Sequence, residues 1–166
     1  MTAADLLTGT GVVPGIAYAP AGWARKPPQV PVDTRIIAEE DRAAETERFR
    51  AAAETVAARF AARASAATGA ASEVLAATAT LAEDRGWIRT ATRQIGAGKP
   101  ATTATAEAIA KFVSQFEKLG GLMAERTTDL KDIRDRVIAE ILGLPEPGVP
   151  QPDQPIILLA PDLAPS

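Results

Sequence analysis

The chain has 166 residues, which is enough for one or two small domains with a packed core. Hydrophobic residues make up 46% and aromatic residues only 4%, so the core has to be built largely from Ala, Leu, Ile and Val, which favours closely packed helices. The formal net charge of -3 argues against a nucleic-acid partner, and no apolar run approaches the roughly 18 residues of a membrane-spanning helix.

Two missing residue types restrict the chemistry. The sequence has no Cys and no His, so it lacks thiol nucleophiles, thiolate metal ligands and the commonest general base. Its acidic residues lie on helical patterns beside Arg or Lys, which indicates solvated faces. We therefore expect no catalytic residue, no cofactor-binding residue and no metal site in this chain. The opening residues, MTAADLLTGTGVV, lack the features of a signal peptide, which predicts a cytoplasmic protein.

The first segment is rich in Gly and Pro and predicts short extended pieces joined by turns. Ile16 and Tyr18 alternate as they would in a strand. The glycines at 9, 11 and 15 do not have the spacing of a dinucleotide-binding loop, and no helix follows them to hold a phosphate. The stretch KPPQVP is typical of a stiff linker, which places a boundary near residue 33.

Two amphipathic helices are predicted next. The first begins at Asp33 or Thr34 and continues to about residue 66, and its apolar stripe consists of Phe49, Ala53, Val56, Phe60 and Ala64. The second follows the break ATGAAS and carries Val74, Thr78 and Leu81 on one face. Asp84 and Gly86 predict a kink or a restart before the period continues at Ile88, Ala91 and Ile95.

Two more helices complete a predicted antiparallel four-helix bundle. The third begins after GAGKP with the stripe Ile109, Phe112, Val113, Phe116 and Leu119, and the glycines at 120 and 121 should loosen the chain after it. The fourth runs through DLKDIRDRV to Leu142, with Leu130, Ile133 and Val137 on its apolar face. Pairs four residues apart, Lys131 with Asp135 and Asp132 with Arg136, are expected on its surface.

The end of the chain has a different pattern. The uninterrupted apolar run from Ile156 to Leu159 is typical of a strand covered on both faces, which needs neighbours that this chain does not supply. We therefore expect a fragment of a longer protein. The strand should pair with residues near 12 to 18 and expose an edge, through which self-association with another copy of the chain is possible.

Four stretches together resemble enzyme I of the phosphoenolpyruvate-dependent sugar phosphotransferase system, in its amino-terminal part. They are GVVPGIAYAPA, LAEDRGW, IILLAPDLAPS and, most specifically, FVSQFEKLGGLMAERTTDLKDIRDRVIAEILGL. The resemblance implies that residues 1–32 and 145–166 belong to a swivelling α/β phosphohistidine domain, and that residues 33–144 form an inserted helical domain that docks the phosphocarrier protein HPr. It also implies that the phosphorylated histidine, the phosphoenolpyruvate site and the magnesium of the parent enzyme lie outside this chain, which alone would bind HPr without transferring phosphate.

Carried over by position, the resemblance implies seven HPr contacts: Leu81, Asp84, Arg85, Trp87, Phe116, Met123 and Arg126. Arg85 and Gly86 stand where relatives often carry acid or a proline-acid pair, and GGLM replaces an acidic turn, so electrostatic attraction of a basic partner should be weaker here. Four of these contacts also have a structural interpretation. Leu81 and Phe116 fit a core stripe, Trp87 fits a cover over a helix end, and Arg126 fits a pair with Asp129.

A competing hypothesis from another functional class is a self-contained helical scaffold or adaptor protein with no enzymatic role. In that interpretation the Gly- and Pro-rich ends are tails. The two hypotheses differ over the run from Ile156 to Leu159, which pairs as a strand only in the first.

Overall fold

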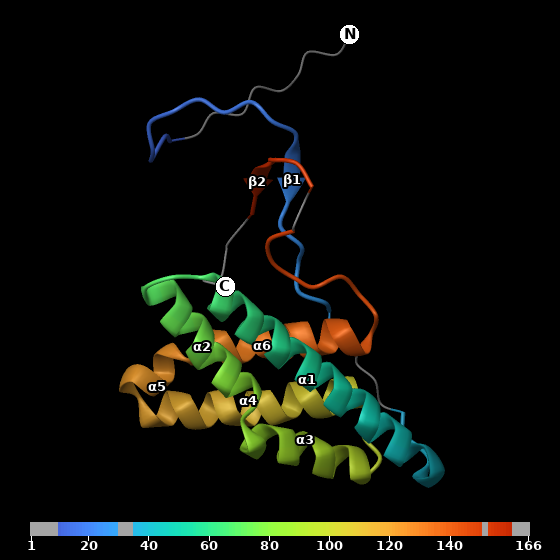
Figure 1. The fold of residues 1–166 in the computed structure, drawn as a ribbon. Helices are drawn as coiled ribbons and strands as arrows, with labels where there is room; N and C mark the ends of the chain where they lie inside the picture. Colours follow the sequence, from blue (N-terminus) through green and yellow to red (C-terminus); the bar gives the residue numbers. More distant parts are fainter. Residues whose placement is uncertain (1–9, 30–34, 151–152, 161–166) are drawn as a thin grey trace.

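The computed structural model describes residues 10–29, 35–150 and 153–160, and it is mainly helical (Figure 1). The helices are α1 (Arg42–Ala66), α2 (Ala70–Ala82), α3 (Arg85–Gly96), α4 (Ala101–Leu119), α5 (Gly121–Glu125) and α6 (Thr127–Ile141). A short 3-10 turn, Glu39–Asp41, precedes α1, and two strands, β1 (Ala21–Trp23) and β2 (Ile157–Leu159), form a small sheet. The predicted fold class is confirmed, with the second helix divided into α2 and α3, and with α5 as a single short turn before α6.

The bundle has an up-and-down arrangement around an alanine-rich core. Figure 1 shows α1 and α4 running in one direction, and α2, α3 and α6 returning in the other. The predicted α1 stripe is confirmed, because Phe49, Val56 and Phe60 are fully buried and its alanines are nearly so. Small residues let helix axes approach closely, so a core with few aromatic rings still packs densely. Among the described residues, no helix is both long and apolar enough to cross a bilayer.

The start of α1 differs from the prediction. Asp33 and Thr34 lie outside the described residues, and the helix begins at Arg42. The backbone before it is held by the α3–α4 connection instead: Ile37 N donates to Gly98 O at 2.8 Å, and Arg42 donates to Ile37 O and Gly96 O at 3.2 Å each. Because the amide of Ile37 donates to a residue about sixty positions away, this stretch stays extended.

The charged helix α6 follows the predicted stripe. Leu130, Ile133 and Val137 are fully buried, and Arg136 Nε donates to Asp132 Oδ2 at 2.9 Å, as predicted for residues four apart. The other predicted pair, Lys131 with Asp135, is wrong, because Asp135 accepts a hydrogen bond from Arg134 Nε at 2.7 Å and Lys131 stays exposed.

The two strands pair in parallel, but not in the predicted register. Ala21 lies opposite Ile157 and Trp23 opposite Leu159, whereas residues 12–18 form no strand and expose their large side chains. The close approach occurs at Gly22, where an added Cβ would lie 2.7 Å from Ile156 Cδ1. The pairing joins residues 21–23 to residues 157–159, so the interpretation of these two segments as separate tails is wrong. Self-association through the sheet edges stays a prediction.

An ion-pair cluster connects the bundle to the segments that carry the strands. Arg136, whose side chain is only 3% exposed, contacts Glu146 as well as Asp132, and Arg63 NH2 donates to Glu146 Oε2 at 2.8 Å. Two residues after Glu146, Gly148 exchanges two backbone hydrogen bonds of 2.9 Å with Arg25, beyond β1. Arg136 also lies 5.1 Å from the centroid of the Phe60 ring. We call Asp132, Arg136, Arg63 and Glu146 the neck cluster.

The pKa values of the two carboxylates in the neck cluster shift in opposite directions. Burial raises the pKa of Asp132 above its ordinary value of 3.8, although the charge and hydrogen bond of Arg136 oppose the change. Burial would also raise the pKa of Glu146, but hydrogen bonds and charges from Arg136 and Arg63 outweigh it, and the net pKa lies below 4.5. Glu146 therefore stabilises the fold as an anion.

The change Glu146→Gln should lower the free energy of unfolding at neutral pH by about 1 to 3 kcal/mol, because buried Arg136 loses an ionic partner. The folded-state pKa of Glu146 lies below the unfolded value, so its stabilisation is present above about pH 4.5 and is lost as pH falls through the folded pKa. Urea denaturation should show the difference between the two proteins shrinking as pH falls from about 5 to 3. Glu47→Gln, at an exposed α1 position, is the control; a difference that does not change with pH would contradict the assignment.

Candidate partner-binding surface

The seven predicted contacts fall into two groups. Leu81, Asp84, Arg85 and Trp87 lie at the junction between α2 and α3, whereas Phe116, Met123 and Arg126 lie where α4, α5 and α6 meet. Phe112, one turn before Phe116 on α4, connects the groups, because an added Cβ at Gly86 would lie 2.8 Å from Phe112 Cζ. Gly86 therefore lets the Phe112 ring of α4 lie close to the α3 backbone, in addition to following the predicted helix break.

Asp84 starts α3, and its role follows from local chemistry. Its Oδ1 accepts hydrogen bonds from Gly86 N at 2.8 Å and Trp87 N at 3.3 Å, so it satisfies two amides of the first helical turn. The predicted kink or restart is thus a restart with Asp84 as the N-cap. Asp84 and Arg85 are both exposed.

The structure corrects the assignment of Trp87 as a partner contact. Its side chain is 0% exposed, and its ring meets Phe49 of α1 edge to face at a centroid distance of 5.8 Å. The indole Nε1 donates to Leu81 O at 3.1 Å, at the end of α2. Because no part of the ring is exposed, it cannot contact a partner directly. The structural interpretation, in which Trp87 covers a helix end, agrees with this position at the end of α2.

The other predicted contacts have mixed surroundings. Leu81 and Phe116 are half-buried and pack against the core, so each can serve both the core and the surface. Arg126 NH1 donates to Asp129 Oδ2 at 3.1 Å, which is the pair expected in its structural interpretation. Met123 is 41% exposed.

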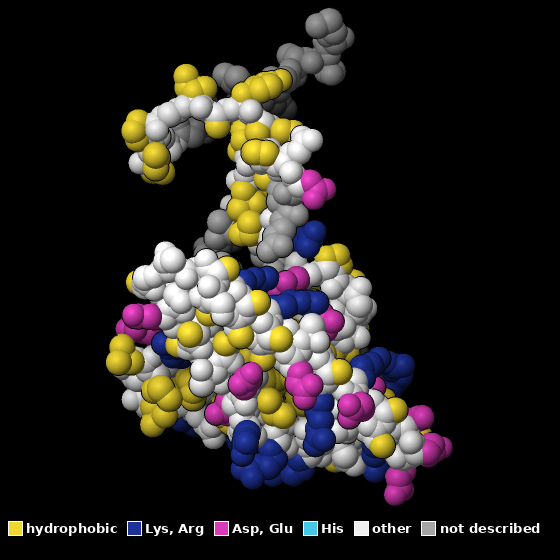
Figure 2. Space-filling view, viewed as in Figure 1, with side chains coloured by type: hydrophobic (Ala, Val, Ile, Leu, Met, Phe, Trp, Pro, Cys, Tyr) yellow, Lys and Arg dark blue, Asp and Glu magenta, His cyan; other side chains and the backbone are white. Residues whose placement is uncertain are grey.

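An exposed apolar strip extends from Phe116 across the α4–α5 turn. Leu119 is 70% and Leu122 79% exposed, and together with Met123 they continue the α4 stripe into solvent (Figure 2). Gly120 and Gly121 both have positive φ, 68° and 55°, and this turns the chain so that α5 lies beyond the core. We call Phe116, Leu119, Leu122 and Met123 the apolar strip.

Sequence reasoning missed two members of the apolar strip. The sequence pattern places Leu119 in a stripe that is expected to be buried, and the predicted contacts do not include Leu122. The available signal was GGLM, because two glycines followed by two large apolar residues indicate a turn that carries exposed hydrophobic side chains.

Beside the apolar strip, α3 and α4 enclose a shallow groove of about 540 Å³. Its lining consists of Gly86, Arg89, Thr90, Arg93, Lys111, Phe112 and Gln115. No carboxylate is among these residues, and Figure 2 shows Lys and Arg side chains gathered over α3. We call it the basic groove.

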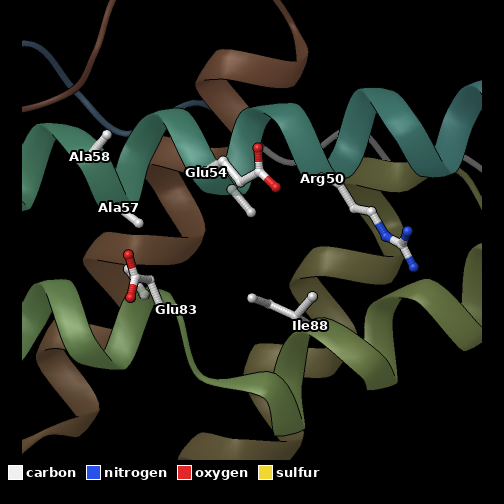
Figure 3. A pocket seen from close by; sticks show the side chains of 8 residues that line it. Arg50, Glu54, Ala57, Ala58, Glu83 and Ile88 are labelled. Atoms are coloured by element: carbon white, nitrogen blue, oxygen red, sulfur yellow. The ribbon is translucent and has the colours of Figure 1, made fainter.

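A second hollow, of about 500 Å³, lies between α1 and the α2–α3 junction. Figure 3 shows Arg50 and Glu54 from α1 facing Glu83 and Ile88 across the opening. Its floor is alanine, and it contains none of the predicted contacts. Within the described ranges, no group of three or more acidic side chains is placed to hold a metal ion.

Truncating the buried ring of Trp87 should destabilise the fold strongly, whereas truncating an exposed leucine should have almost no effect on stability. Trp87→Ala should lower the free energy of unfolding by about 3 to 5 kcal/mol, because it leaves a cavity beneath the α2–α3 junction. Leu122→Ser should change it by no more than about 0.5 kcal/mol, because this side chain already faces water. Urea denaturation followed by circular dichroism measures both. Equal effects of the two changes would mean that Trp87 is not a core residue.

The chain is similar to phosphoenolpyruvate-protein phosphotransferases. It is 38% identical over 160 residues to the enzyme of Streptomyces coelicolor. The aligned region covers 96% of this chain and 29% of that protein. It is 41% identical over 63 residues to the enzyme of Haloferax volcanii, covering 33% of this chain and 11% of that protein. The chain therefore spans less than a third of the length of these relatives.

A solved structure has the same arrangement. The solution structure of Enzyme I (nEIt) superposes with a TM-score of 0.75 at 26% sequence identity, covering 92% of this chain and 64% of that one. The family described as "PEP-utilising enzyme, N-terminal" matches residues 8–126. On this match, and on the similarity that covers 96% of its length, the chain belongs to the family of amino-terminal parts of phosphoenolpyruvate-utilising enzymes.

Proposed function

We propose that this chain is the docking module for the phosphocarrier protein HPr within a phosphoenolpyruvate-protein phosphotransferase of the cytoplasm. The observation that carries the proposal is the apolar strip. Leu119 and Leu122 are largely exposed beside the half-buried Phe116, although burying them would be favourable. Contiguous apolar side chains on a folded surface are typical of sites where another protein binds.

The chemistry of the chain supports a binding role. It has no histidine to carry a phosphoryl group, so in this proposal the phosphohistidine lies in a part of the enzyme outside these 166 residues. The phosphoenolpyruvate site and the magnesium would lie outside them as well. The whole enzyme would move phosphate from phosphoenolpyruvate to its histidine and then to HPr, and this chain would hold HPr during the second step.

The domain division belongs to the same proposal. Residues 33–144 would form the HPr-binding unit, and residues 1–32 and 145–166 would form part of the phosphohistidine domain. The pairing of β1 with β2 supports this division, because it brings residues 21–23 and 157–159 into one sheet apart from the helices (Figure 1).

Titration of the ¹⁵N-labelled chain with unlabelled cognate HPr tests the proposal. Amide resonances of Phe116 to Arg126 should shift as HPr is added, and Leu119→Ser/Leu122→Ser should weaken binding at least about tenfold, because two apolar anchors are lost. Leu144→Ser, exposed beyond the other end of α6, is the matched control and should leave the affinity unchanged.

Absence of any shift at about millimolar HPr would contradict the proposal, since such a concentration still detects binding of about 4 kcal/mol. Shifts confined to α1 and the neck cluster would place the docking site on another face.

A further inference from the structure

A third hollow lies at the neck, between the helical bundle and the segments that carry the two strands. Its volume is about 370 Å³, and its lining consists of Arg25, Arg59, Ala62, Arg63, Glu146 and Val149. The two middle arginines come from α1, Arg25 follows β1, and Glu146 follows α6, so three segments of the chain meet here. Figure 2 shows basic and acidic side chains together at this junction. We call it the arginine hollow.

The ion pairs around the arginine hollow leave one positive charge over. Arg59 NH1 donates to Glu140 Oε2 at 2.7 Å, and Arg63 NH2 donates to Glu146 Oε2 at 2.8 Å. The neck cluster adds one further arginine and one further carboxylate, which contact each other. These charges balance, and Arg25 is the surplus cation in the lining.

Arg25 brings its charge to the hollow without a partner. Its backbone is fixed, because it exchanges two hydrogen bonds of 2.9 Å with Gly148. Its side chain is exposed and forms no ion pair or hydrogen bond with any residue that the structure describes. The backbone contact therefore holds this free guanidinium group beside a hollow that two other guanidinium groups already line.

The arginines of α1 also keep donors available. A guanidinium group has several N–H donors, and Arg59 and Arg63 are each bonded to one carboxylate. Their side chains remain 41% and 29% exposed, whereas that of Arg136 is 3% exposed. Glu146, the acid in the lining, is neutralised by both Arg63 and Arg136. An anion can therefore enter the hollow without breaking these pairs and without meeting an uncompensated carboxylate.

We propose that the arginine hollow binds a tetrahedral oxyanion, either phosphate or the terminal phosphate of a small phosphomonoester, between Arg25 and the two arginines of α1. Planar guanidinium groups match phosphate oxygens with parallel hydrogen bonds, and a phosphate has enough oxygens to engage groups from different directions. The bound anion would connect the segment after β1 to α1, and so stabilise the neck. The inference is independent of the proposed function, because it requires no partner protein.

Titration of the ¹⁵N-labelled chain with sodium phosphate tests the inference, with pH and ionic strength held constant by buffer and sodium chloride. The amide and Nε–H resonances of Arg25, Arg59 and Arg63 should shift and saturate, with a dissociation constant of about a millimolar or below. Arg25→Gln should weaken binding at least about tenfold, because one of the three guanidinium groups is lost. Arg50→Gln is the matched control and should leave the affinity unchanged, since it removes the same charge from an exposed α1 position outside the hollow. Nuclear Overhauser contacts between β1 and β2 verify that both variants keep the sheet.

Thermal denaturation gives a second readout. Because the anion binds the folded neck, phosphate should raise the unfolding midpoint of the unchanged chain more than sodium chloride of the same ionic strength does. Phosphate also stabilises proteins in general, so the informative quantity is the difference between variants. The extra stabilisation should be lost in Arg25→Gln and kept in Arg50→Gln. Equal stabilisation of both variants by phosphate would contradict the inference.

Glycerol phosphate and acetate distinguish the ligands. Equal affinities for glycerol phosphate and phosphate would identify phosphomonoesters as ligands, and binding of inorganic phosphate alone would restrict the hollow to the free anion. Both results support an oxyanion site, and acetate should bind at least about tenfold more weakly. Shifts that do not saturate, or that are equally large with acetate or in Arg25→Gln, would indicate general screening of surface charge and would overturn the inference.

Discussion

The indole of Trp87 lies at the point where three helices meet, and the shape of the candidate partner-binding surface depends on its burial. The ring packs edge to face on Phe49 of α1, and its nitrogen donates to the last turn of α2. With the ring held there and Asp84 capping the next turn, α3 leaves the junction in one direction only. That direction brings Gly86 against Phe112 and turns Arg89 and Arg93 outward beside α4.

Charge is divided between two parts of the molecule with different physical roles. At the neck, Arg136 is almost completely buried, so it requires carboxylate partners, and Asp132 and Glu146 supply them. The same guanidinium packs on Phe60, which couples the ion pairs to the hydrophobic core. On α3 the guanidinium groups of Arg85, Arg89 and Arg93 are exposed to water, and no described residue forms an ion pair with them. Charges of the first kind maintain the fold, whereas charges of the second kind are available for recognition.

The candidate surface was only partly predictable. The motif LAEDRGW identified the α2–α3 junction, because an acid before a helix start has a local role as a cap. It did not show that Trp87 faces inward, since the direction of a ring after a helix break depends on where α1 lies. The exposure of Leu119 could not be inferred from the sequence for a related reason. Periodicity shows that residues share a face, but how far a neighbouring helix covers that face depends on the lengths and ends of both helices.

The sequence by itself determined the helix class, the apolar stripes, the break at Asp84 and the turn at Gly120 and Gly121. These features depend on residues within a few positions of one another, so local chemistry is sufficient. Tertiary structure decided where α1 begins, because Ile37 is bonded to Gly98 instead of continuing a helix. It also supplied the cap of α4, since Ala101 N donates at 2.8 Å to Glu45 of α1. It paired β2 with residues 21–23, where Gly22 leaves room for Ile156. In each case the deciding partner is more than fifty residues away along the chain, and no local pattern specifies such a partner.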